Sequence, residues 1–319
     1  MTSNHHSSVT QRAWNIGRRQ FGNNIICYFP GMFYFYGKRG KYPAVSITGN
    51  QCDLQCDHCK GRLLESMIPA VTPEHLYALC KRLEDNGHLG ILISGGCDES
   101  GCIPWQPFIP VIRQIKEETN LFISMHCGFS NDKDIDRLAS SKVDQILIDV
   151  VGSDETIENI YHLENGLDHL KRTLSKLKLS GIPIIPHILL GLNYGVINSE
   201  WSALEMVQDI NPGLLVVIVI MSLQQTPMSA VKPPTLDDII DFFSACRVRL
   251  PLTEIALGCA RSRHRLDIEK AAIDCGFNRI AIPSAEVCEY ARKQHLQVLF
   301  QNTCCSVPYM ESFNENGKS

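Results

Sequence analysis

The stretch Ala44-Val-Ser-Ile-Thr-Gly-Asn-Gln-Cys-Asp-Leu-Gln-Cys-Asp-His-Cys-Lys-Gly61 joins a short apolar run to a loop that carries three cysteines. The run Ala44–Thr48 predicts a buried strand, because β-branched residues suit a pleated surface. Cys52, Cys56 and Cys59 follow directly after it at the spacing C-x3-C-x2-C. In folds that alternate strands and helices, active sites assemble at the carboxyl ends of the strands. The stretch therefore predicts the first strand of an α/β fold and a functional loop behind it.

Seven further β-branched runs follow, separated by amphipathic stretches. Strands are predicted at Ile91–Ser94, Leu121–Met125, Gln145–Val150, Ile184–Leu189, Leu214–Ile220, Glu254–Leu257 and Arg279–Ile282. Helices are predicted at Pro73–Asn86, Gln106–Glu118, Lys133–Ser140, Leu167–Ser180, Ser199–Asp209, Leu236–Arg249, Leu266–Cys275 and Ala285–His295. Such pairs indicate parallel strands covered by helices. We therefore expect an α/β fold of the (β/α)8 TIM-type barrel class with N-terminal and C-terminal extensions, and a doubly wound open sheet is the alternative.

The barrel is expected to form a single domain over residues 44–305. Residues 1–43 form an N-terminal extension, with aromatic residues around Phe29–Tyr36, that is expected to pack against or cap the barrel end. Residues 306–319 are expected to form a polar tail. No internal repeat or low-complexity linker divides the chain.

Composition restricts the class of protein. The chain has 319 residues, a formal net charge of −4 and no Lys/Arg stripe, so a nucleic-acid partner is not expected. The longest apolar runs, such as Gly213–Met221, are shorter than a membrane span, and the polar start Met1–Thr10 lacks the apolar core of a secretion signal. We therefore expect a cytoplasmic protein that does not enter a membrane.

Fourteen cysteines is a high count for such a chain. Because disulfides are disfavoured in the cytoplasm, clustered cysteines indicate metal or redox chemistry. Cys80, Cys246, Cys275 and Cys288 lie in helical or helix-ending patterns and are expected to be small core residues instead.

The three cysteines of the loop suit an iron–sulfur cluster. Thiolates hold such clusters, normally four of them for a [4Fe–4S] cluster, so Cys52, Cys56 and Cys59 leave one iron without a protein ligand. An open coordination position is what a catalytic metal site needs. Two alternatives stay open: a zinc site that adds His58 or another residue, and a chance grouping of thiols. Zinc ribbons usually show paired C-x2-C knuckles, and no second knuckle follows here.

With these residues the loop resembles the signature of the radical S-adenosylmethionine (SAM) superfamily. The resemblance implies that Cys52, Cys56 and Cys59 hold a [4Fe–4S] cluster whose open iron chelates the amino and carboxylate groups of SAM. In that family an electron from the cluster cleaves SAM to methionine and a 5′-deoxyadenosyl radical, which abstracts a hydrogen atom from the substrate. The position before the last cysteine is usually aromatic there and leans on the adenine, and in this chain it is His58.

Three later segments at the ends of predicted strands match the same family. Ser94-Gly95-Gly96 matches a turn whose backbone contacts the SAM amino group, since glycine permits close approach; the family often continues with Glu, and this chain has Cys97. Asp149 matches a polar residue on the SAM ribose, and His187-Ile-Leu-Leu-Gly191 matches a segment along the adenine. Each segment alone also fits a plain turn or a cap. The resemblance thus predicts the cofactor-binding residues His58, Ser94, Gly95, Gly96, Asp149, His187 and Gly191.

The span from about Pro30 to Cys305 resembles the biotin-synthase-like branch, and most closely the subunits of the two-protein, archaeal-type lipoyl synthase. Its most distinctive matches are Leu257-Gly-Cys259-Ala-Arg261 and the pair Cys304-Cys305. This resemblance implies sulfur insertion into an octanoyl chain on a lipoyl carrier protein. It also implies a homologous second subunit and an electron donor such as ferredoxin or flavodoxin. The alternative is a radical SAM synthase or rearrangement enzyme of the same branch that acts on another small molecule without inserting sulfur.

Sulfur-inserting members of the superfamily hold an auxiliary iron–sulfur cluster that is consumed as the sulfur donor. By this resemblance Cys259, Cys304 and Cys305 are expected to bind such a cluster, with Cys97 or Cys127 as additional ligands. Each of these cysteines alone is also compatible with a buried thiol or a lone surface cysteine.

The remaining predictions concern the surroundings of the substrate. Arg261 is expected to contact the substrate or the SAM carboxylate, or else to pair with a local acid. The basic runs Lys38–Lys41 and Arg261–Arg265 are expected to be solvated surface or to meet an acidic carrier protein. An octanoyl substrate implies an apolar lining, although ordinary packing also explains the candidates, which are Phe29, Met32, Phe33, Tyr34, Met221 and Met228.

Overall fold

One curled parallel sheet forms the centre of the molecule. The computed structural model describes residues 2–32, 34–35, 38–263 and 265–314. Within these residues eleven strands form the sheet, in the order β13-β1-β12-β11-β10-β9-β8-β7-β6-β4-β5. The strands are β1 (Asn24–Tyr28), β4 (Ala44–Ser46), β5 (Ile68–Pro69), β6 (Gly90–Ser94), β7 (Phe122–His126), β8 (Gln145–Asp149), β9 (Ile184–Leu190), β10 (Leu214–Val219), β11 (Glu254–Leu257), β12 (Arg279–Ala281) and β13 (Gln297–Gln301). A separate antiparallel pair consists of β2 (Tyr34–Phe35) and β3 (Lys38–Arg39).

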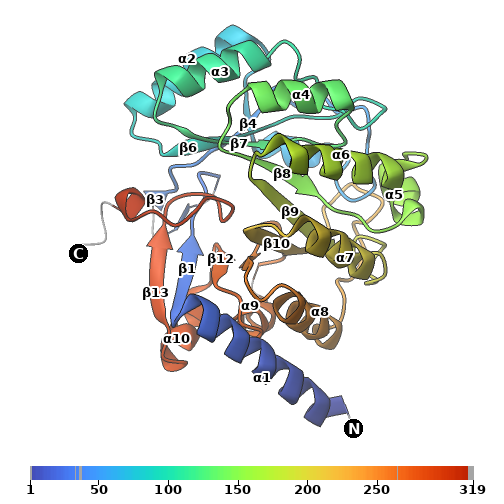
Figure 1. The fold of residues 1–319 in the computed structure, drawn as a ribbon, viewed down its shortest axis with the longest axis vertical. Helices are drawn as coiled ribbons and strands as arrows, with labels where there is room; N and C mark the ends of the chain where they lie inside the picture. Colours follow the sequence, from blue (N-terminus) through green and yellow to red (C-terminus); the bar gives the residue numbers. More distant parts are fainter. Residues whose placement is uncertain (1, 33, 36–37, 264, 315–319) are drawn as a thin grey trace.

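Helices cover the convex face of the sheet (Figure 1). They are α1 (Thr2–Phe21), α2 (Pro73–Asp85), α3 (Ile109–Glu118), α4 (Asp132–Ser140), α5 (Asp154–Tyr161), α6 (Gly166–Ser180), α7 (Glu200–Ile210), α8 (Leu236–Arg249), α9 (Leu266–Asp274) and α10 (Ala285–Lys293), with 3-10 helices η1 (Arg62–Ser66) and η2 (Glu311–Asn314). At the start of α2 the Thr72 side chain accepts a hydrogen bond from the His75 backbone N–H at 3.2 Å. Gly87, Gly181 and Gly276 have positive φ where α2, α6 and α9 end. None of the described helices has the length and apolar content to cross a membrane.

The predicted α/β, TIM-type arrangement is confirmed. The eight predicted strands are present as β4 and β6 to β12, and their ends lie within two residues of the predicted ends. The sheet is a half-barrel, because β13 and β5 are its edges and no described residues pair these two strands. The strands β1, β5 and β13 are additions to the predicted set.

The N-terminal segment supplies part of this framework. β1 lies between β12 and β13, where Ile26 pairs with Arg279 on one side and with Leu299 on the other. α1 packs against α8 and α9, and a Cβ atom on Gly17 would lie only 2.4 Å from the Gly276 carbonyl oxygen. Residues assigned by sequence to an extension therefore contribute a strand to the sheet itself.

The chain that follows β13 turns into the concave side of the sheet. Gln145 Nε2 donates a hydrogen bond to Ser306 Oγ at 3.0 Å. Arg279 Nη1 donates to the carbonyl oxygens of Cys305 at 3.0 Å and Val307 at 2.9 Å. Since Gln145 and Arg279 are the first residues of β8 and β12, this segment fills the interior near the amino ends of the strands. Ser306 and Val307 are buried there, although the sequence groups them with the polar tail.

The main core lies between the convex face of the sheet and its helices. Cys80, Cys246 and Cys275 are fully buried in it, as predicted, and Cys288 is buried in a smaller cluster with Cys27. All fourteen cysteines lie in the described part of the chain and are free thiols.

Candidate functional site

A cavity of about 210 Å³ lies at the carboxyl ends of β4, β6, β7 and β8. Its wall combines the loop between β4 and η1, the glycine turn after β6 and the last residues of β7 and β8. The cavity brings together the predicted residues Cys52, Cys56, His58, Cys59, Ser94, Gly95, Gly96 and Asp149. The sequence places these residues on separate strands, and the parallel sheet aligns their ends.

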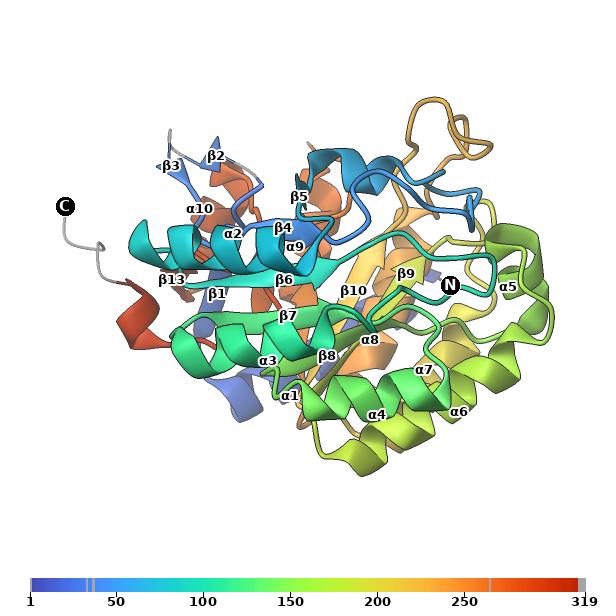
Figure 2. The same cartoon turned by 90° about the horizontal axis from the view of Figure 1, so that it is seen from above.

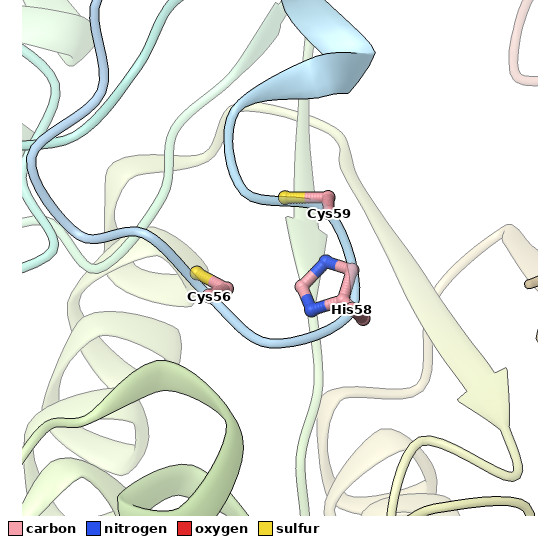
Figure 3. Close-up of side chains that lie close together, drawn as sticks. All are labelled: Cys56, His58 and Cys59. Carbon is pink, nitrogen blue, oxygen red and sulfur yellow. The ribbon is translucent and has the colours of Figure 1, made fainter. Parts of the chain in front are cut away.

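The cluster loop, residues 52–59, is a tight turn. The backbone N–H groups of Cys59 and Lys60 donate to the Cys56 carbonyl oxygen at 3.1 and 2.8 Å. Figure 3 shows the side chains of Cys56, His58 and Cys59 on the inner side of this turn. One ligand atom from each of these three residues lies within 4.8 Å of the others. Cys52 lines the same cavity but stands outside this close group.

The η1 helix continues the loop along the edge of the cavity. Arg62 Nη1 donates to the Gln224 carbonyl oxygen at 2.5 Å and to Gln225 Oε1 at 2.9 Å. These bonds place η1 beside the loop that follows β10, at the same end of the molecule (Figure 2). Leu63 and Leu64 of η1 line the cavity.

The electrostatics of the turn favour a thiolate. A hydrogen bond from Cys56, assisted by His58, lowers the pKa of Cys59 to about 4. The same bond and burial raise the pKa of Cys56. Burial alone would lower the pKa of His58, but its hydrogen bond and its attraction to the Cys59 thiolate raise it. Of the two hydrogen-bonded thiols, one is therefore favoured as the thiolate, which is the metal-binding form of cysteine.

The residues present fit an iron–sulfur cluster. The three thiols of the cluster loop line one cavity, and thiolates are the preferred ligands of iron–sulfur clusters and of zinc. His58 Nδ1 is buried and has no hydrogen-bond partner among the described residues, so a polar atom of the site is left for a bound group. The close group Cys56, His58 and Cys59 suits a single ion, whereas a cluster held by three thiolates would take Cys52 together with Cys56 and Cys59.

The glycine turn is packed against the cluster loop. A Cβ atom on Gly96 would lie 1.9 Å from the Gln51 carbonyl oxygen and 2.6 Å from Cys52 Cβ. A Cβ atom on Gly95 would meet only the side chains of Ile47, Thr48 and Ile103, at 3.1 to 3.3 Å. Gly96 is therefore required by the close approach of the Cys52 backbone, which is a contact within the protein rather than one with a cofactor.

Three ionisable side chains converge on the interior side of the cavity. His126 Nε2 lies 3.4 Å from Asp149 Oδ1, and the rings of His126 and His187 are 6.0 Å apart. Burial would raise the pKa of Asp149, but the charge and hydrogen bond of His126 lower it to about 2. Burial lowers the pKa of His187 to about 4. Since the Ile185 carbonyl oxygen, 3.0 Å away, can only accept, the neutral His187 ring carries its proton on Nδ1.

Two predicted residues in and directly after β9 do not line the cavity. His187 is buried beside it, and Gly191 lies at the end of β9, where its backbone N–H donates to Glu200 Oε1 at 2.7 Å. Gly191 has a φ of +79°, and a Cβ atom there would lie 2.6 Å from the Pro234 ring, so this glycine serves the turn.

The late cysteines gather elsewhere in the interior. Cys259, Cys304 and Cys305 belong to one cluster with Tyr28 and Ala281, and none of the three lines the cavity. A hydrogen bond from Cys305 lowers the pKa of Cys304 to about 6, whereas burial raises that of Cys259 to about 11. In the described residues these cysteines do not form a group as compact as that of Cys56, His58 and Cys59. The hydroxyl of Tyr28 is buried there without a hydrogen-bond partner among the described residues.

The two additional cysteines have different positions. Cys97 lines the cavity, and burial raises its pKa. Cys127 is fully buried at the end of β7, does not line the cavity, and has a pKa raised to about 12 by burial.

Arg261 pairs with a local acid. Its Nη2 donates to Glu269 Oε1 at 2.6 Å, and its Nη1 donates to the carbonyl oxygens of Gly258 and Ala281, both at 2.7 Å. The side chain is buried at 2% exposure. Arg261 therefore holds β11, β12 and α9 together, and of its two predicted roles the structure shows the pairing with a local acid.

The apolar wall of the cavity comes from residues that the sequence did not single out. They are Leu54, Leu63, Leu64, Met67, Leu92, Ile103, Phe129, Tyr161 and Leu170. Of the predicted lining, Phe29 and Met228 are buried elsewhere, Met32 and Met221 do not line this cavity, and Phe33 and the side chain of Tyr34 lie outside the described residues.

His126 was also missed by sequence reasoning. It ends β7 as Asp149 ends the neighbouring β8, so a polar residue at a strand end was the available signal. Tyr161 had no such signal, because it lies at the end of α5, a helix that the sequence pattern did not predict.

The chain is similar to known proteins in part of its sequence and in its fold. The family model described as Radical SAM superfamily matches residues 46–198. The fold is similar to that of the methylornithine synthase PylB, with a TM-score of 0.63 and 15% identity over 93% of this chain and 90% of that one. It is also similar to the FeFe-hydrogenase maturase HydG from Carboxydothermus hydrogenoformans, with a TM-score of 0.63 and 14% identity over 94% and 73% of the two chains. At these identities the structural likeness shows the fold alone. No curated protein matches the sequence.

Proposed function

We propose that this chain, whose residues 46–198 match the Radical SAM superfamily model, is a radical SAM enzyme that inserts sulfur into an octanoyl chain on a lipoyl carrier protein. The observation that carries the first part is the convergence of Cys52, Cys56, Cys59 and the glycine turn on one cavity. The proposal that the substrate is an octanoyl chain and that sulfur is inserted rests on the late cysteines and on the apolar wall of the cavity. It also rests on the resemblance of the sequence to lipoyl synthase subunits.

Each group of the cavity has a role in this proposal. Cys52, Cys56 and Cys59 would hold a [4Fe–4S] cluster, and the chemistry that it would supply together with SAM is hydrogen abstraction by a 5′-deoxyadenosyl radical. Asp149, kept ionised by His126, accepts hydrogen bonds from the ribose hydroxyls of SAM. The glycine turn offers backbone carbonyl oxygens to the amino group of SAM. The apolar side chains of the wall exclude water from the reaction.

The interior thiols support the sulfur-inserting step. Cys259, Cys304 and Cys305 lie in one cluster, Cys304 has a lowered pKa, and Tyr28 of the same cluster has a buried hydroxyl without a hydrogen-bond partner among the described residues. These residues would hold an auxiliary iron–sulfur cluster as the sulfur source. The same proposal includes three partners: an octanoylated carrier protein, a homologous second subunit, and a ferredoxin or flavodoxin as electron donor. So does a cytoplasmic location, which the fourteen free thiols support.

Iron counting after anaerobic reconstitution tests the proposal. About eight irons per chain are expected, four for each of two cubane clusters. Cys56→Ala removes the first cluster and abolishes the formation of 5′-deoxyadenosine. Cys304→Ala removes only the second cluster, so 5′-deoxyadenosine still forms in the presence of an octanoylated carrier but no thiolated product appears.

A second candidate is a radical SAM synthase or rearrangement enzyme that inserts no sulfur. His126 on the cavity wall favours it, because an octanoyl chain offers no hydrogen-bonding group to this side chain. About four irons per chain, with Cys304→Ala as active as the parent protein, would select this candidate. Zinc in place of iron in an anaerobic preparation would select the single-ion site of Cys56, His58 and Cys59 and exclude both enzymes.

A further inference from the structure

A carboxylate inside the cluster loop is tied to two other elements around the cavity. Asp57 lies between the ligands Cys56 and Cys59, and its side chain is largely buried. Asp57 Oδ2 accepts a hydrogen bond from Tyr194 Oη at 2.5 Å. Asp57 Oδ1 lies 3.1 Å from His162 Nε2 and 3.8 Å from Lys60 Nζ.

On one side Asp57 is anchored to the end of α5. Its backbone N–H donates to the Ile160 carbonyl oxygen at 2.9 Å, in addition to the side-chain contact with His162. His162 caps α5 with a φ of +61°, and its backbone N–H donates to the Glu158 carbonyl oxygen. The neighbouring Tyr161 lines the cavity, so this end of α5 is part of the site.

On the other side Tyr194 stands on a turn that a second carboxylate organises. Glu200 is buried, and Oε1 accepts hydrogen bonds from the backbone N–H groups of Gly191 at 2.7 Å and Leu192 at 3.3 Å. Its Oε2 accepts from the Asn198 N–H at 2.8 Å. The turn between β9 and α7 is therefore held closed from both ends, and it presents the Tyr194 hydroxyl to Asp57.

We propose that Asp57 is a positioning residue for the cluster: through Tyr194 and His162 it holds the Cys56–Cys59 turn in its ligating shape before any metal arrives. The inference rests on the proposed function, since it assumes that the turn binds a cluster. The Cys52 end of the loop has its own anchor, because the Asp53 N–H donates to the Cys97 carbonyl oxygen at 2.8 Å. Asp57 supplies the corresponding anchor for the other two ligands.

Removal of the Tyr194 hydroxyl is the sharpest test. Tyr194 is 45% exposed, so Tyr194→Phe leaves the core intact and removes only one hydrogen bond to a carboxylate. Tyr77→Phe is the matched control, since Tyr77 Oη donates to Glu118 Oε2 at 2.6 Å between α2 and α3, outside the cavity. Both variants should unfold at the temperature of the parent protein to within a few degrees.

The readout is the first-order loss of iron from the anaerobically reconstituted protein to a ferrous chelator, together with the EPR spectrum of the reduced cluster. A hydrogen bond to a charged group corresponds to about a tenfold change in an equilibrium, so iron loss should be about tenfold faster in Tyr194→Phe. Asp57→Asn should show a larger effect and an altered EPR spectrum, and Tyr77→Phe should match the parent protein. Equal iron loss from Tyr194→Phe and the parent overturns the inference.

A measurement on the metal-free chain separates this inference from the proposed function. In apoprotein the anchored turn restricts access to Cys56 and Cys59, so alkylation of these thiols, followed by mass spectrometry, should be faster in Tyr194→Phe than in Tyr77→Phe. If the parent protein binds no iron, the proposed function fails while this comparison still applies. Equal alkylation rates in the two variants count against Asp57 as an anchor.

Discussion

The replacement Gly96→Ala tests how the glycine turn and the cluster loop depend on each other. The new Cβ atom would begin 1.9 Å from the Gln51 carbonyl oxygen, and the Cα and Cβ atoms of Cys52 would lie 2.7 and 2.6 Å away. Real Cβ contacts are essentially never closer than 3.0 Å, so the loop must retreat by 1.1 Å at Gln51. The atoms in the way are mostly backbone, which cannot turn aside as a flexible side chain does.

The cost of this overpacking is about 1–3 kcal/mol in the free energy of unfolding, the range typical of added methylene groups in a packed site. The more specific effect falls on the metal. Because Cys56 and Cys59 are held by their own turn, the shift moves Cys52 alone relative to them. The expected protein is folded but retains little iron after anaerobic reconstitution.

Gly95→Ala provides the matched control. Its Cβ atom would meet side-chain atoms of Ile47, Thr48 and Ile103 at 3.1 to 3.3 Å, which can give way by a few tenths of an ångström. Urea denaturation of the apoprotein measures the stability of both variants, and iron content with EPR measures the cluster. The reasoning is refuted if Gly96→Ala keeps the iron content and spectrum of the parent, or if Gly95→Ala loses as much iron as Gly96→Ala.

Three further predictions use other parts of the structure. Arg261→Met leaves the buried Glu269 carboxylate without its cationic partner and should lower the free energy of unfolding by about 3–5 kcal/mol in urea denaturation; a loss below about 1 kcal/mol would contradict a buried ion pair. The pKa of His187 is about 4 in the folded chain and 6.5 in the unfolded chain. The neutral His187 ring therefore contributes fully to the free energy of unfolding above pH 6.5, and this contribution decreases as the pH falls towards 4. At pH 5 this difference amounts to about 2 kcal/mol, and His187→Gln should flatten the decrease in the urea midpoint between pH 7 and 5; an unchanged slope would contradict it. Gly17→Ala forces α1 away from α9 and should cost about 1–3 kcal/mol, whereas Gly213→Ala, whose Cβ atom meets nothing within 4 Å, should change stability by less than about 0.5 kcal/mol.

Local sequence signals were sufficient for most of the framework. β-branched runs bounded by amphipathic stretches located β4 and β6 to β12, and Thr72 and Gly181 marked helix ends correctly. The spacing of Cys52, Cys56 and Cys59 located the cavity, because three residues in one short loop stay close whatever the rest of the chain does.

Local sequence signals did not predict contacts between residues that are distant along the chain. β1 was missed because five residues between a helix and an aromatic loop carry no periodicity of their own, and the strand is defined by its place between β12 and β13. The sequence left two roles open for Arg261 for a similar reason. Its partner Glu269 is in the sequence, but only the packing of β11, β12 and α9 removes both charges from water and turns them towards each other.

The amino-acid sequence by itself determined the α/β class, the eight central strands and the loop that carries the thiol ligands, since each depends on residues close together in the chain. The tertiary structure alone decided that β1 completes the sheet, that His126 meets Asp149, and that Tyr194 and His162 hold Asp57. These contacts join residues that are distant along the chain, and their positions depend on which strands are neighbours and on how far each one extends.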